Sequence, residues 1–197
     1  MTHDYNDADK QRSFDVIPDG TICTVRMIVR PGNAGEGGML KRSKDGKSEA
    51  LDCEFIVQDG EHAKRRFYGL FTLEGETQGH IEAGRISQSK LRAILESARG
   101  IDPNDTSEAA KAARRTTSYA DFNRLCFMCR VGVDPPTNGY KAKNKLDYII
   151  TPEDKAWKAV PQQPQQPAAT SAPASSPARP ASNVPAPIQR PAWGQRG

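Results

Sequence analysis

Hydrophobic and polar residues alternate along five stretches of the chain, and each stretch predicts a β-strand. Residues 20–30, 51–57 and 65–73 come first, and residues 125–133 and 145–151 follow after a long gap. Successive side chains of a strand point to opposite faces, so this period of two is typical of strands with one buried face. In the first two strands, the face expected in the core carries Cys23, Val25, Met27 and Val29, then Leu51, Cys53, Phe55 and Val57.

The third strand joins a basic run to an aromatic one, in the segment AKRRFYGLFTL. Its alternation places Phe67 and Phe71 in the core, while Arg66 and Tyr68 share the other face. Gly69 lies between the two phenylalanines, and a glycine inside a strand often marks a bulge or a barrel corner. We therefore expect the chain to bend at this point.

The gap between the third and fourth strands has a helical period. Leu91, Ile94 and Leu95 are spaced for one helix face, which predicts a helix over residues 86–100 with Gly100 as its C-terminal stop. A second, shorter helix is predicted over residues 105–115, with Asp105 as its cap. Residues 117–123 are expected to add one more helical turn.

The resulting order, β-β-β-α-β-β, is that of an OB-fold, a small five-stranded Greek-key barrel. We therefore predict an all-β domain with a helical insert, closed into such a barrel. An OB-fold binds its ligands on the face of strands two and three and on the loops after strands one and four. Those loops are residues 31–50, which are rich in Gly, Ser and charges and are expected to be irregular and mobile, and residues 134–145.

Composition divides the chain into three parts: a disordered N-terminus over residues 1–13, the OB-fold domain over 14–155, and a tail over 156–197. The tail is mostly Pro, Ala, Gln and Ser, so it has little to bury, and we expect it to be disordered. It contains four basic residues and no acidic ones, which accounts for the whole net charge of +4. The domain itself is neutral, so a nucleic-acid surface on it must rest on local clustering of charge.

Basic residues do cluster where an OB-fold would hold its ligand. They lie in both loops, although acids interleave the first loop, and beside Tyr68 at the start of the third strand. We predict that the cations meet phosphates and that Tyr68 and Tyr140 stack on bases. The sequence leaves open whether the outward-facing arginines of strands one and four line the binding face or the opposite wall. The complete set of candidate residues is Arg26, Lys41, Arg42, Lys64, Arg65, Arg66, Tyr68, Arg130, Tyr140, Lys141, Lys143 and Lys145.

The four cysteines raise a second possibility, a structural zinc site. Cys126 and Cys129 match C-x-x-C, but the spacer is bulky, and residues i and i+3 of a strand face opposite sides. Cys23 and Cys53 fall on core-facing positions, where a free thiol packs as a small hydrophobe. The chain also lacks a phosphate-binding glycine loop and a nucleophile elbow. We therefore expect no metal, no cofactor and no enzymatic activity.

Five segments resemble a phage and prophage family of OB-type single-stranded DNA-binding proteins. They are FDVIPDGTICTV, GEHAKRRFYGLFTLEG, RISQSKLRAILESARGIDP, DFNRLCFMCRVGVD and GYKAKNKLDYIITPED, which together span residues 14–155. The resemblance implies a role in phage replication or recombination inside a bacterial host cell. Many prokaryotic proteins of this kind end in an acidic tip that recruits partner enzymes, whereas this chain has no acid after Asp154.

These patterns leave two classes of function open. The first is sequence-independent binding of single-stranded DNA, with replication or recombination proteins and a second copy of the chain as further candidate partners. The alternative is a protein-interaction or assembly module that acts through the barrel and the Pro-rich tail. No apolar run approaches the ~20 residues that span a bilayer, and the polar N-terminus is unlike a signal peptide. We therefore expect a cytoplasmic protein without a membrane partner.

Overall fold

The structure, a computed structural model, describes residues 6–7, 15–137 and 139–162. The predicted disordered N-terminus, residues 1–13, lies outside the described residues apart from Asn6 and Asp7. Residues 163–197 of the predicted tail lie outside them as well.

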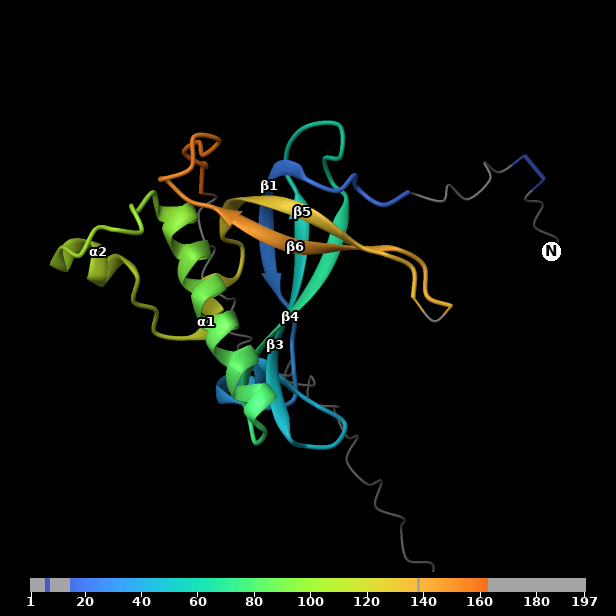
Figure 1. The fold of residues 1–197 in the computed structure, drawn as a ribbon, viewed down its shortest axis with the longest axis horizontal. Coiled ribbons are helices and arrows are strands. Elements are labelled where there is room, and N and C mark those ends of the chain that lie inside the picture. Colours follow the sequence, from blue (N-terminus) through green and yellow to red (C-terminus); the bar gives the residue numbers. More distant parts are fainter. Residues whose placement is uncertain (1–5, 8–14, 138, 163–197) are drawn as a thin grey trace, which may run out of the picture. The chain divides into compact units, whose positions relative to one another are not determined.

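Within the described residues, six strands form one antiparallel sheet (Figure 1). The strands pair in the order β2-β3-β1-β5-β6, and β4 pairs with the other side of β3. This pairing places the central strand β1 between β3 and β5. The strands are β1 (Thr21–Val29), β2 (Leu40–Arg42), β3 (Ser48–Val57), β4 (Arg66–Gly75), β5 (Cys126–Asp134) and β6 (Lys143–Ile150).

The sheet is not closed into the barrel that the sequence predicts. β4 and β6 lie near one another, but no hydrogen-bonded ladder joins them in the described part of the chain. The N-terminal segment is fixed beside β6 at this opening. The side-chain amide of Asn144 accepts from the backbone N–H of Ile17 at 2.8 Å and donates to its carbonyl at 2.8 Å. The described sheet therefore keeps a gap between β4 and β6.

The prediction of an irregular loop over residues 31–50 is wrong for part of that segment. It contains the short 3-10 helix η1 (Glu36–Gly38) and the strand β2, which pairs with the start of β3. Left-handed glycines such as Gly35 turn the backbone back on itself, and the side chain of Leu40 is buried. A strand of three residues is too short to show a hydrophobic period, which explains why the sequence pattern missed it.

The helical insert is longer and differently capped than the sequence suggests. α1 (Gln78–Arg99) begins before residue 86 because the Thr77 side chain accepts the backbone N–H of His80, and it ends at the left-handed Gly100 as predicted. α2 (Glu108–Ala113) is capped by Ser107 rather than by Asp105. The predicted further turn is η2 (Tyr119–Phe122). No helix of the described residues is long and apolar enough to cross a bilayer.

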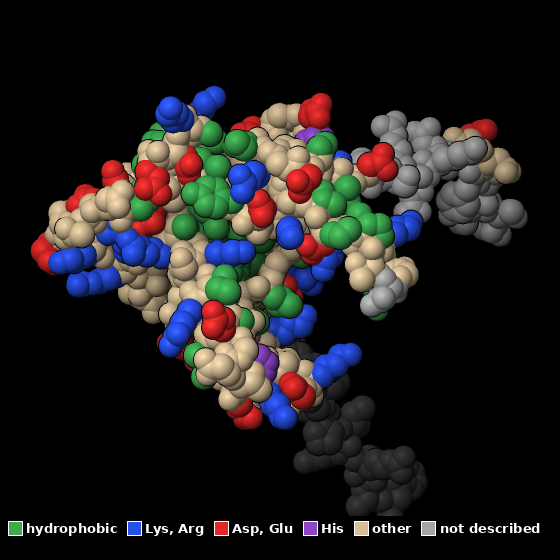
Figure 2. All heavy atoms as spheres, viewed as in Figure 1, with side chains coloured by type: hydrophobic (Ala, Val, Ile, Leu, Met, Phe, Trp, Pro, Cys, Tyr) green, Lys and Arg blue, Asp and Glu red, His purple; other side chains and the backbone are tan. Residues whose placement is uncertain are grey.

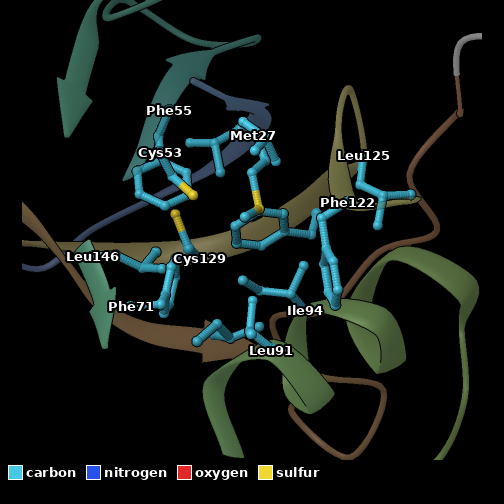
Figure 3. Close-up of a cluster of buried hydrophobic side chains, with 14 of the residues drawn as sticks. Met27, Cys53, Phe55, Phe71, Leu91, Ile94, Phe122, Leu125, Cys129 and Leu146 are labelled. Atoms are coloured by element: carbon cyan, nitrogen blue, oxygen red, sulfur yellow. The ribbon is translucent and has the colours of Figure 1, made fainter. Parts of the chain in front are cut away.

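The core lies between the sheet and α1, and it uses the strand faces that the alternation predicts. Figure 3 shows Met27, Cys53 and Phe55 on the sheet side of this core and Ile94 and Leu91 on its α1 side, with the sulfur atoms of Cys53 and Cys129 directed toward one another. The Phe55 ring centroid lies 5.2 Å from that of Phe67 and 6.1 Å from that of Phe127. A Cβ on Gly69 would lie 3.2 Å from the Phe55 ring, so Gly69 makes room for this ring. The bulge expected at Gly69 is not there, because the register shift between β3 and β4 lies at Glu49/Ala50.

Residues 156–162, the first part of the predicted tail, contact the domain. The indole N–H of Trp157 donates to the Ser97 carbonyl at 3.1 Å. The Gln162 amide accepts the backbone N–H of Cys126 at 3.1 Å and donates to its carbonyl at 2.8 Å. Cys126 and Met128 lie on the face of β5 away from the core, and this segment explains why they are nevertheless buried.

Candidate nucleic-acid interface

The turn between β3 and β4 presents three consecutive cations. Val57 closes the turn by donating to the Arg65 carbonyl at 2.9 Å and accepting the backbone N–H of Lys64 at 2.8 Å. Lys64 has a φ of 70°, a left-handed conformation that costs a non-glycine residue on the order of 1–2 kcal/mol. Strained residues of this kind are often kept at functional positions. The basic run of residues 64–66 is therefore held in a defined place at the start of β4.

Tyr68 follows on the outward face of β4, with 53% of the residue exposed. The Arg30 guanidinium lies 5.4 Å from its ring centroid, at the distance of a cation–π contact. Asp52 holds Arg30 at 3.5 Å and Lys41 at 3.2 Å, measured from its Oδ2 to each nitrogen. The Tyr68 ring thus lies against a cation that a carboxylate of β3 keeps in position.

A cleft runs from this face across the gap between β4 and β6. Its first part, of about 590 Å³, is lined by residues 63–68 and by Lys143 and Asn144. A second part, of about 370 Å³, lies between Tyr68 and Leu70 on one wall and residues 143–146 on the other. A third, of about 420 Å³, is lined by Tyr140, Lys141 and Lys143. The gap therefore brings together basic residues that are far apart in the sequence.

Asp134 is the main acid of the β5–β6 end of the cleft. Its carboxylate lies 2.9 Å from Lys145 Nζ and 3.6 Å from Lys143 Nζ. The hydrogen bond from Lys145 is the largest cause that lowers the pKa of Asp134, and the same bond raises the pKa of Lys145. Lys64 and Lys141 form no ion pair with any other described residue. The cleft thus combines paired cations with cations available to a ligand.

Other candidate residues lie away from this cleft. Arg42, the last residue of β2, pairs with Glu49 of β3 at 2.6 Å. Arg26 extends from the outward face of β1 between β3 and β5, and Arg130 stacks on Tyr148 of β6. Figure 2 shows Lys and Arg side chains in several places on the face viewed, so the expected gathering of cations on one side is only partly found.

The sequence pattern missed three residues that line the cleft or its face. Arg30 follows β1 and contacts Tyr68, and Leu70 is 61% exposed two residues further along β4. Lys90 reaches the cleft from α1. The alternation already placed Arg30 and Leu70 on outward faces, but only the pairing of β1, β3 and β4 shows that these faces adjoin.

The cysteines form no metal centre in the described residues, where no group of three or more His, Cys, Asp or Glu side chains is placed to hold an ion. Cys23 and Cys129 face one another from β1 and β5, whereas Cys126 lies on the opposite face of β5. Burial raises the pKa of the Cys53 thiol, which keeps it protonated, and a metal ligand must be a thiolate.

Comparison with known proteins adds no family to this picture. Neither the models of known protein families nor the curated proteins contain a match to the chain. The assignment of function therefore depends on the geometry of the cleft and on its chemistry.

Proposed function

We propose that the chain is an OB-type module that binds single-stranded DNA without sequence preference, as in phage or prophage replication or recombination in a bacterial cell. The observation that carries the proposal is the convergence of residues 64–66, Tyr68 and residues 140–145 on one cleft. An OB-fold is a partly open five-stranded barrel, and the pairing of β1, β3, β4, β5 and β6 fits one that is open between β4 and β6.

Binding would combine phosphate neutralisation with base stacking. The interface holds nine cations and three carboxylates, so its local charge is positive although the domain is neutral. Stacking on Tyr68 tolerates any base because every base has a π face. The cations are Arg30, Lys41, Lys64, Arg65, Arg66, Lys90, Lys141, Lys143 and Lys145, and the acids are Asp52, Glu54 and Asp134.

Fluorescence anisotropy with labelled thymidine oligonucleotides and with a duplex of equal length, at two salt concentrations, tests the proposal. We expect tighter binding to the single strand and a steep loss of affinity as salt increases. Equal affinity for single strand and duplex, or no binding at low salt, would refute it.

The second candidate function is a protein-interaction module. It is favoured by the acids of β3, since Asp52 and Glu54 already pair with Arg30, Lys41 and Arg66 and reduce the charge of the outward face. A partner protein captured by the purified chain after nuclease treatment would support this alternative. Capture that is lost on nuclease treatment would instead point to nucleic acid.

A further inference from the structure

A second arginine–tyrosine stack lies on β5 and β6 and repeats the arrangement at Tyr68. The Arg130 guanidinium lies 5.3 Å from the Tyr148 ring centroid, against 5.4 Å between Arg30 and Tyr68. Asp147 holds Arg130 at 2.8 Å, just as a carboxylate of β3 holds Arg30. Both tyrosines lie on strands and keep about half of their surface exposed, 53% for Tyr68 and 42% for Tyr148.

The clefts beside the two rings adjoin along α1 and β6 and together form a groove. The part beside Tyr68 and a further part of about 490 Å³ beside Tyr148 share Ile86 and Lys90, which lie one helical turn apart on α1. On the other wall, β6 supplies residues 143–146 to one part and residues 147–149 to the next. At a strand rise of about 3.3 Å per residue, Lys143 and Tyr148 are about 16 Å apart. In Figure 2, hydrophobic side chains gather where the end of β6 meets α1.

The charges around Tyr148 are balanced, unlike those around Tyr68. Each acid near this ring also has a partner: Glu96 binds Arg92 and Arg114, Asp147 binds Arg130, and Glu153 accepts from Asn104. Asp154, which hydrogen-bonds to the Tyr148 side chain, accepts the backbone N–H of Thr151 at 3.2 Å. Such a surface offers an aromatic face and little neutralisation of phosphate. The charged groups around the ring and its part of the groove are four cations, Lys90, Arg92, Arg114 and Arg130, and four acids, Glu96, Asp147, Glu153 and Asp154.

Resting on the proposed function, we propose that the bound single strand continues from Tyr68 along β6 and stacks a further base on Tyr148. Only an oligonucleotide long enough to cover both rings gains from the second stack. Loss of one base–aromatic stack weakens binding by about 5- to 150-fold. Because the tyrosine ring neutralises no phosphate, this loss leaves the salt dependence unchanged.

The test uses Tyr148→Ala and Tyr148→Phe in the full chain, with oligomers of about 5 and about 20 thymidines, within and beyond the ~4–16 nucleotides that an OB-fold covers. Tyr148→Ala should weaken binding of the long oligomer about 5- to 150-fold and leave the short one unchanged. The slope of log affinity against log salt should equal that of the wild type. Tyr148→Phe keeps the aromatic face and should bind both oligomers like the wild type.

Photo-crosslinking adds a readout that a structural role would not change. An oligomer carrying 5-iodouracil should form adducts at both Tyr68 and Tyr148 of the wild type. Adducts at Tyr68 alone, with Tyr148→Ala binding both oligomers as tightly as the wild type does, would overturn the second stack while the proposed function stands. A wild type without preference for single strands would remove the proposed function, and the second stack with it.

Discussion

Replacing Tyr68 with alanine tests the centre of the candidate interface. The ring makes the only described cation–π contact on the β3–β4 face, with Arg30, and is otherwise open to a ligand. If a base stacks on it, Tyr68→Ala removes about 1–3 kcal/mol of binding free energy, which is about 5- to 150-fold in Kd.

The cost to the fold should be modest. About half of a tyrosine surface of roughly 200 Å² is covered at this position, so burial contributes at most about 2.5 kcal/mol. The cation–π contact with Arg30 adds about 0.5–1 kcal/mol at an exposed site. The stability that Tyr68→Ala loses should be smaller than the sum of these two contributions, since the unfolded chain also buries part of the ring.

Anisotropy with a thymidine oligomer measures the change in Kd, and thermal denaturation followed by circular dichroism measures the change in stability of the fold. Ile81→Ala is the matched control, because Ile81 is 45% exposed on α1 and lies outside the clefts beside Tyr68. It should lose little stability and no affinity. The reasoning is refuted if Tyr68→Ala binds as tightly as the wild type, or if it unfolds, which would place Tyr68 in the core.

Three further substitutions address charge and strain. Asp134→Asn should raise affinity for a thymidine oligomer severalfold, since it removes the acid that competes with phosphate for Lys145. Unchanged affinity would mean that DNA does not bind at the β5–β6 end of the cleft. Lys64→Gly should raise the free energy of unfolding by about 0.5–1 kcal/mol in urea titrations and weaken DNA binding. Arg124→Gly, at the other left-handed non-glycine position of the described residues, should raise the free energy of unfolding without changing DNA affinity. Arg114→Met should cost about 3 kcal/mol of stability, because it leaves the buried Glu96 carboxylate of α1 with the exposed Arg92 as its ion-pair partner. A loss below about 1 kcal/mol would show that the Arg114–Glu96 pair contributes little.

The alternation of hydrophobic residues predicted the strands and their buried faces because it reflects burial directly. The core positions of β1 and β3, from Cys23 to Val57, are buried as expected. Sequence alone could not predict the additional pairing of β2 with β3 or that the sheet stays open, since these depend on contacts between distant segments. Asn144 is one example: its amide binds Ile17, and the sequence gives no sign of it.

The candidate site was predictable in its residue types and less so in its assembly. Local charge marked residues 64–66 and 140–145, and the cleft brings these two segments together. Whether a cation is available to a ligand depends on its acid partner, which lies on a neighbouring strand. Arg42 was expected to meet phosphate, but Glu49 lies directly opposite it on β3.

The three acids of the interface set a quantitative expectation for binding. They orient cations such as Arg66, whose Nη1 lies 3.0 Å from Glu54, but they also compete with phosphate for them. The slope of log affinity against log salt is about −0.7 per neutralised phosphate on a single strand. If every cation meets a phosphate, the slope approaches about −6. If the acids keep their five partners, Arg30, Lys41, Arg66, Lys143 and Lys145, four cations remain and the slope is about −3. A slope near zero, with binding intact, would mean that the strand avoids this cleft altogether.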